Sequence, residues 1–152
     1  MNKRDSHLVR FPEHEPIHTY VHRMRSRYGE TDRMGYVYYG RYLEYFEVAR
    51  TEMIRNLGLP YKMLEEEGVM LPVVNAALQY KSPVHYDEQM DVHVMVFDMP
   101  LVRLHTYYKV FTERSEQPHV LGQVTLAFSD AETRRPCRAP DHFLKSLKSV
   151  SD

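Results

Sequence analysis

The chain has 152 residues, which is enough for one domain with one hydrophobic core. Hydrophobic residues make up 43% of it and charged residues 27%, as is typical of a globular protein. The formal net charge is −1 at pH 7, which excludes the strongly basic field of most nucleic-acid-binding domains.

The chain contains one cysteine, Cys137, so an intrachain disulfide is impossible and a reducing compartment is favoured. No apolar run approaches the ~20 residues that a membrane-spanning helix needs. The first residues, MNKRDSHLVRFPEHEP, lack the apolar stretch of a secretory signal. We therefore predict a cytoplasmic protein with no membrane span.

The first elements are a tail, a strand and a loop. Residues 1–17 are polar and contain two prolines, which predicts a flexible N-terminal tail. Residues 18–27 alternate between two faces, which predicts a first strand. Residues 28–40 are rich in glycine and tyrosine and predict an ordered loop.

A long helix is predicted from Tyr39 or Gly40 to Asn56. Its apolar stripe follows spacings of four, three, four and four residues, at Tyr42, Phe46, Ala49, Met53 and Leu57. Gly58 and Pro60 end the helix, and a short helix over residues 61–67 follows.

The hydrophobic period then changes to two, which predicts strands over residues 70–80, 91–98, 103–113 and 120–128. The last three strands are joined by tight connections and form an antiparallel meander. A short helix over residues 141–148 follows them. One helix cannot cover both faces of a five-stranded sheet, so we predict at least a dimer.

Several common catalytic signatures are absent from the sequence. It has no G-x-S-x-G nucleophile elbow, no glycine-rich phosphate loop, no H-E-x-x-H and no C-x-x-C. The nine histidines show no close metal-ligand spacing. We therefore predict no metal site and no cofactor.

A pair of carboxylates, Glu30 and Asp32, lies in the loop that leads into the long helix. A helix N-terminus carries unsatisfied N–H groups and partial positive charge, so it can bind a developing oxyanion. A carboxylate beside it can activate water or attack directly. A thioester suits this site because its thiol leaving group has a pKa of roughly 8.5 and needs little acid assistance. An aspartate before a helix is, however, most often a turn former.

The segment RYGETDRMGYVYYGRYLEYFEVAR, residues 27–50, resembles the motif of the 4-hydroxybenzoyl-CoA thioesterase family of hotdog proteins. The matching residues are Tyr28, Glu30, Thr31, Asp32, Gly35, Val37, Tyr38, Tyr39, Tyr42, Phe46, Glu47, Ala49 and Arg50. The similarity extends over roughly residues 18–147 and includes Lys81, Pro83 and the turn from Thr133 to Pro136.

The resemblance implies an α+β hotdog fold over residues 18–148, in which a curled antiparallel sheet of about five strands wraps a central helix. It implies an acyl-CoA thioesterase with Asp32 as nucleophile or general base. It also implies that the backbone N–H of Tyr39 polarises the thioester carbonyl, that Gly35 and Val37 belong to the substrate site, and that the active sites lie at the dimer interface of a homodimer or homotetramer.

Coenzyme A carries phosphates, so basic residues are expected at the entrance of the site. The candidates are Lys81, Arg134, Arg135 and Arg138, although a residue of this kind is more often an ordinary solvated surface charge. Arg41 stands where the family usually has asparagine, and it is expected to pair with Glu44 or with a CoA phosphate.

Two other functions remain open. The first is hydrolysis of thioesters carried by acyl-carrier protein. The second is acyl-CoA binding without turnover, against which the intact Asp32 and Gly35 argue. A hydratase of the same fold would require a histidine beside the aspartate, and residues 28–40 contain none.

Overall fold

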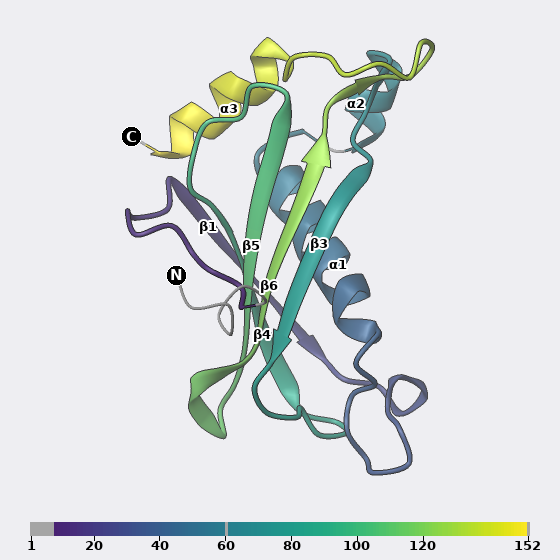
Figure 1. The fold of residues 1–152 in the computed structure, drawn as a ribbon, viewed down its shortest axis with the longest axis vertical. Helices are drawn as coiled ribbons and strands as arrows, with labels where there is room; N and C mark the ends of the chain where they lie inside the picture. Colours follow the sequence, from purple (N-terminus) through teal and green to yellow (C-terminus); the bar gives the residue numbers. More distant parts are fainter. Residues whose placement is uncertain (1–7, 60, 152) are drawn as a thin grey trace.

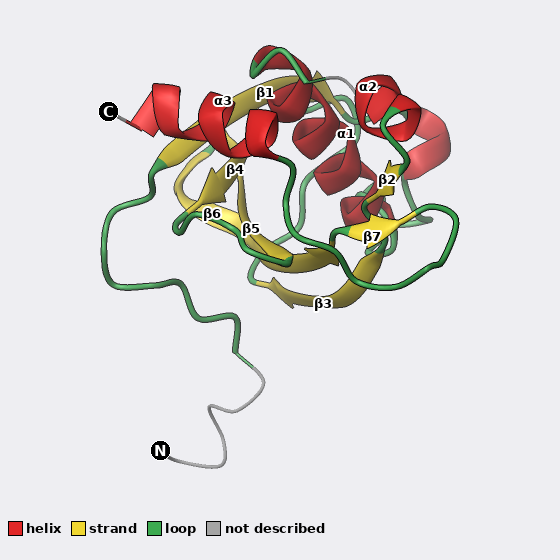
Figure 2. Ribbon diagram, turned by 90° about the horizontal axis from the view of Figure 1, so that it is seen from above, coloured by secondary structure: helices red, strands yellow, loops and turns green. Residues whose placement is uncertain are grey.

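The computed structural model describes residues 8–59 and 61–151. Its main layer is a five-stranded antiparallel sheet in the order β1-β4-β5-β6-β3. The strands are β1 (His18–Arg25), β3 (Val73–Tyr80), β4 (Gln89–Val96), β5 (Arg103–Thr112) and β6 (Ser115–Ala127). The sheet curls around the long helix α1 (Arg41–Asn56), as Figures 1 and 2 show. The predicted order of one strand, a long helix and a meander is confirmed.

The core lies between α1 and the concave face of the sheet. Alternate residues of β5 are buried, as the period of two predicted, at Leu104, Thr106, Tyr108, Val110 and Thr112. The predicted helix stripe is also buried at Tyr42, Phe46, Ala49 and Met53, and Leu57 is partly buried. The Phe46 ring stacks on the Tyr108 ring with a centroid distance of 4.3 Å, which joins the helix to the sheet.

The strand predicted over residues 70–80 is divided into two. Val69–Met70 forms β2, which pairs with β7 (Ser129–Asp130) in a separate two-stranded sheet, and β3 begins at Val73. Pro72 lies at the break, because proline has no N–H to donate to a strand partner. The prediction of one continuous strand was therefore wrong, and β7 had not been predicted.

Two further α-helices lie in the described part of the chain. The short helix α2 (Tyr61–Glu66) follows α1, and α3 (Asp141–Ser151) follows the last strand, as predicted but with slightly different ends. Within the described residues, no helix is long and apolar enough to cross a membrane. The cytoplasmic location stays a prediction.

The outer face of the sheet is partly covered by residues that precede β1. The Phe11 ring lies 5.2 Å from the Tyr107 ring and 6.2 Å from the Phe97 ring, between ring centroids. The Lys109 ammonium lies 5.0 Å from the centroid of the Phe11 ring. The domain boundary at residue 18 stays a prediction, but Phe11 in the predicted tail contacts the sheet.

Candidate functional site

The loop between β1 and α1 is fastened to the helix by Glu30. This residue ends the short 3-10 helix η2 (Tyr28–Glu30), and its side chain is buried. Its Oε1 accepts hydrogen bonds from the backbone N–H of Arg27 at 2.9 Å and from the Tyr45 hydroxyl at 3.1 Å. Burial, together with the nearby Glu30 carboxylate, raises the pKa of Tyr45. Glu30 therefore has a clear structural function in the loop.

Asp32 occupies a tight turn with one side-chain oxygen engaged. Its Oδ1 accepts hydrogen bonds from the backbone N–H groups of Met34 at 2.8 Å and Tyr36 at 3.2 Å. Gly35 closes the turn with a φ of +78°, a conformation that residues with a Cβ rarely adopt. The Asp32 side chain is exposed, and no hydrogen bond within the described residues uses its Oδ2. One carboxylate oxygen is thus anchored while the other is available to a ligand.

The turn is docked on the segment that precedes β4. The carbonyl oxygen of Gly35 accepts a hydrogen bond from the Tyr86 N–H, and the Val37 N–H donates to the Val84 carbonyl, both at 2.8 Å. Gly35 therefore shapes the turn and does not line the cavity described below, whereas the buried Val37 does.

The start of α1 lies next to this turn. Gly40 is the N-cap residue, and Tyr39 directly precedes it. The carbonyl oxygen of Tyr39 accepts a hydrogen bond from the Tyr80 hydroxyl at 3.1 Å. Among the described residues, none accepts a hydrogen bond from the Tyr39 N–H. This N–H can therefore donate to a ligand oxygen at the positive end of the helix dipole.

Asp32 and Tyr39 line one cavity of about 280 Å³. One wall comes from the loop and from α1, and it consists of Asp32, Tyr36, Val37, Tyr39 and Tyr42. The facing wall comes from the end of β3 and the residues after it, and it consists of Tyr80, Lys81, Ser82 and Pro83. The structure therefore brings together four of the predicted site residues: Asp32, Val37, Tyr39 and Lys81.

The sequence reasoning did not assign Tyr36, Tyr42, Tyr80 and Ser82 to the cavity. A weak signal existed, since six of the twelve tyrosines lie within residues 28–45 and Ser82 lies between Lys81 and Pro83, which belong to the region of similarity. Burial raises the pKa of Tyr42 to about 12, and burial and then Tyr39 raise the pKa of Tyr80. These phenols are therefore neutral at pH 7 and present aromatic surface to the cavity.

Three of the four predicted basic residues do not line this cavity. Arg134, Arg135 and Arg138 are exposed in the connection between β7 and α3. Figure 1 shows this connection at the opposite end of the sheet from loop 28–40. Within one chain these arginines are far from Asp32, because β6 carries the chain along the whole length of the sheet before they occur, and their role in binding CoA stays a prediction.

Arg41 contacts Glu44 and does not line the Asp32 cavity. Its Nη1 lies 3.1 Å from Oε1 and 3.0 Å from Oε2 of Glu44, three residues later in α1. The pair borders a separate hollow with Arg27, Gly29 and Glu30. Arg41 was expected to pair with Glu44 or with a CoA phosphate, and the structure shows the pair with Glu44.

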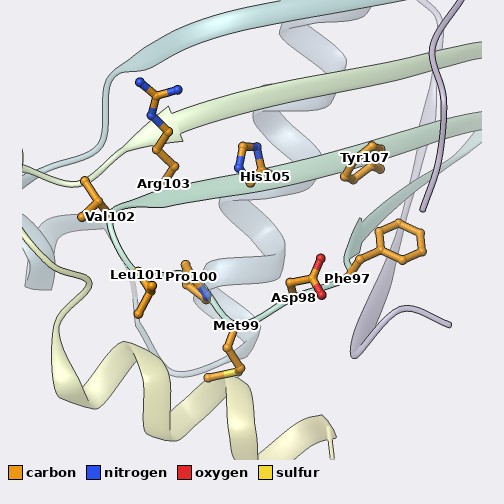
Figure 3. A pocket seen from close by; sticks show the side chains of 9 residues that line it. All are labelled: Phe97, Asp98, Met99, Pro100, Leu101, Val102, Arg103, His105 and Tyr107. Carbon is orange, nitrogen blue, oxygen red and sulfur yellow. The ribbon is translucent and has the colours of Figure 1, made fainter. Parts of the chain in front are cut away.

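The hollow beside Arg41, of about 340 Å³, is larger than the Asp32 cavity, but its carboxylates Glu30 and Glu44 are engaged by other residues. Two further cavities are also larger. One of about 400 Å³ is on the outer face of the sheet, where His105 and Tyr107 project from β5 while α1 lies behind the sheet (Figure 3). Its carboxylate, Asp98, is paired with His14 at 3.0 Å. The other, of about 490 Å³, lies between α1 and β3. Neither combines an available carboxylate with a helix N-terminus, so the Asp32 cavity is the candidate active site.

Comparison with known proteins agrees with this geometry. Residues 26–147 match the family described as the thioesterase-like superfamily. A putative acyl-CoA thioesterase, YneP of Bacillus subtilis, is 43% identical over 82 residues, which cover 54% of this chain and 59% of that protein. The alignment thus spans less than two thirds of YneP. The putative esterase sll0410 of Synechocystis is 31% identical over 120 residues, which cover 76% of this chain and 72% of that protein.

A solved structure extends the comparison to three dimensions. The DHNA-CoA thioesterase from Staphylococcus aureus superimposes with a TM-score of 0.74 and 32% identity, over 79% of this chain and 80% of that one. The predictions of a hotdog fold and of membership in a family of thioester hydrolases are confirmed. The chain belongs to the thioesterase-like superfamily.

Proposed function

We propose that this protein hydrolyses an acyl- or aroyl-CoA thioester to the free acid and CoA in the Asp32 cavity. The observation that carries the proposal is the Asp32 carboxylate, which has one anchored oxygen and one available oxygen beside the start of α1. Relatives named as acyl-CoA thioesterases support the substrate class.

In the reaction, the Tyr39 N–H donates a hydrogen bond to the thioester carbonyl oxygen and stabilises the negative charge that develops there. Asp32 acts in one of two ways. As general base, it takes a proton from water while the water oxygen bonds to the carbonyl carbon. As nucleophile, it forms an anhydride with the acyl group, which water then hydrolyses. In both cases the carbon–sulfur bond breaks and the CoA thiolate leaves.

The edge of the sheet at β3 supports assembly into a dimer. Its sequence, VVNAALQY, has no charged residue and no proline, although in the described part of the chain β3 pairs on one side alone, with β6. Natural proteins usually protect such an edge with charges, proline or a covering element. Val73 and Val74 are about half exposed, at 53% and 50%, and Leu43 of α1 is 43% exposed beside the same edge. We propose that β3 pairs antiparallel with β3 of a second copy.

Such a pairing would bring the basic turn of one copy to the cavity of the other. β3 runs toward the Asp32 cavity, and its start lies near β2 and the turn after β7, where the Ala131 N–H donates to the Gly68 carbonyl at 2.8 Å. Antiparallel pairing places the start of one β3 beside the end of the other. Arg134, Arg135 and Arg138 of the second copy would then join Lys81 as binding groups for the CoA phosphates.

We expect Val74→Lys to convert the assembly to monomers, because a charge on the uncharged edge opposes strand pairing. Sedimentation equilibrium at micromolar concentration should show a dimer or larger species for the wild type and a monomer for the variant. Val21→Lys is the matched control, since Val21 is 45% exposed on the other edge strand, β1, and should leave the assembly unchanged. A wild-type monomer would contradict the proposal.

We expect Arg41→Asn to leave the KM for acyl-CoA unchanged to within about twofold at both low and high salt, because an exposed ion pair contributes little. Steady-state kinetics at two ionic strengths test this. A KM that rises strongly at low salt alone would instead assign Arg41 to a CoA phosphate.

The experiment that tests the proposed function is a hydrolysis assay across short-chain, long-chain and aromatic acyl-CoA thioesters, with matched thioesters of acyl-carrier protein in parallel. Release of CoA that depends on Asp32 supports the proposal. A preference for carrier-bound thioesters would identify the carrier protein as the partner, and acyl-CoA binding without hydrolysis would identify a binding protein.

A further inference from the structure

Two residues in one wall of the Asp32 cavity, Lys81 and Ser82, are held in place by the buried residue His119 of β6. Its carbonyl oxygen accepts hydrogen bonds from the N–H groups of Lys81 at 2.9 Å and Ser82 at 3.1 Å. Its ring Nδ1 lies 2.7 Å from Ser82 Oγ, and its Nε2 lies 2.7 Å from Thr112 Oγ1. His119 is fully buried, so its ring has a fixed orientation. The same residue therefore fixes both the backbone and the hydroxyl of Ser82.

Ser82 combines this fixed position with access to the cavity. Its side chain is exposed and lines the cavity that Asp32 also lines. A serine hydroxyl has one donor and two acceptor sites, so the hydrogen bond to His119 leaves capacity for a ligand. Burial, and then the charge of Arg114, lower the pKa of His119, so its ring is neutral at pH 7 and is both a donor and an acceptor. A polar group that is already immobilised costs less to use in binding than a mobile one.

We propose that Ser82 contacts the attacking water in the thioester site and that His119 is its positioning residue. The inference rests on the proposed function. Nε2 of His119 faces the Thr112 hydroxyl and not a carboxylate, so the pair lacks the third member of a nucleophilic triad. Ser82 therefore acts by hydrogen bonding. With Asp32 as general base, Ser82 orients the attacking water, which gives one proton to Asp32 and directs its other hydrogen to Ser82 Oγ.

The first test is Ser82→Ala, which removes the hydroxyl but keeps the two backbone hydrogen bonds to His119. We expect kcat to fall about 10-fold with little change in KM, since the lost contact orients the water and does not bind the acyl group. Ser82→Thr keeps a hydroxyl and should retain most of the activity. Ser115→Ala, which removes a serine hydroxyl of β6 outside the cavity, is the matched control and should leave kcat unchanged.

The second test asks whether His119 acts through Ser82. His119→Gln should lower kcat about as much as Ser82→Ala, and the double variant should show no further loss, because the two residues form one unit. If the two losses in kcat multiply in the double variant, the positioning role is overturned, because a structural effect of His119 on the wall would be independent of the Ser82 hydroxyl. If His119→Gln does not fold, equal losses in Ser82→Ala and Ser82→Thr would overturn the proposal by themselves.

The outcome separates this inference from the proposed function. Hydrolysis that depends on Asp32 but is unaffected by Ser82→Ala would overturn the assignment of Ser82 alone. A wild-type protein that does not hydrolyse any thioester would overturn both.

Discussion

Asp32→Asn is expected to lower kcat for thioester hydrolysis by at least ~10²-fold, the lower range for a positioned acid–base group. Asparagine is nearly isosteric, and its Oδ1 can still accept hydrogen bonds from Met34 and Tyr36, so the turn should be retained. What is lost is the negative charge that takes a proton from water or attacks the carbonyl carbon. Steady-state kinetics measure the loss, and a thermal melt checks that the fold is unchanged.

Glu30→Gln is the matched control on the neighbouring carboxylate. Its carboxylate is buried and accepts hydrogen bonds from Arg27 and Tyr45, so the substitution should affect stability more than turnover. A kcat near that of the wild type in Asp32→Asn, or an equal loss in Glu30→Gln, would show that Asp32 has been wrongly chosen as the catalytic group.

Gly122→Ala is expected to lower the free energy of unfolding by about 1–3 kcal/mol, the usual cost of overpacking a core. A Cβ at Gly122 would lie 2.7 Å from Cζ of Phe46 and closer still to its Cε2. The Phe46 ring cannot easily move away, because it is fully buried and stacks on Tyr108. Chemical denaturation followed by circular dichroism measures the change.

Gly29→Ala provides the comparison for this substitution. A Cβ at Gly29 would have no heavy atom within 4 Å, so the unfolding midpoint should change little. If Gly122→Ala were as stable as Gly29→Ala, the close packing of α1 against β6 would not hold in solution. This test is independent of activity, so it examines the fold and not the proposed site.

Much of the sequence motif serves the fold and not the cavity. Phe46, Ala49 and Arg50 are buried in α1, and Arg50 donates a hydrogen bond to the Tyr108 hydroxyl at 3.1 Å. Glu30 fastens the loop to the helix, and Gly35 permits the turn at Asp32. A motif of this kind identifies the family reliably because many of its residues shape the same backbone, but it does not by itself separate structural from chemical roles.

The sequence by itself determined the order of the main elements and the inward face of each. The helix stripe and the alternation in β5 are local periodic patterns. Each pattern gives its element one apolar face, and burial of that face is sufficient to form the element. The end of α1 was also predictable from the sequence, since Gly58 ends this helix with a φ of +82°. The break in the strand at Pro72 could have been read from the sequence as well, because proline lacks the N–H that a strand requires.

The tertiary structure alone decided which residues share the cavity. Tyr80 and Ser82 meet Asp32 because β3 ends beside loop 28–40, and His119 holds Ser82 from 37 residues away along the chain. Likewise, Arg134, Arg135 and Arg138 are far from Asp32 of the same chain, because β6 carries the chain to the far end of the sheet before the connection that holds them. Such contacts depend on strand order and register, which link distant segments, whereas periodicity reports only which way each side chain faces.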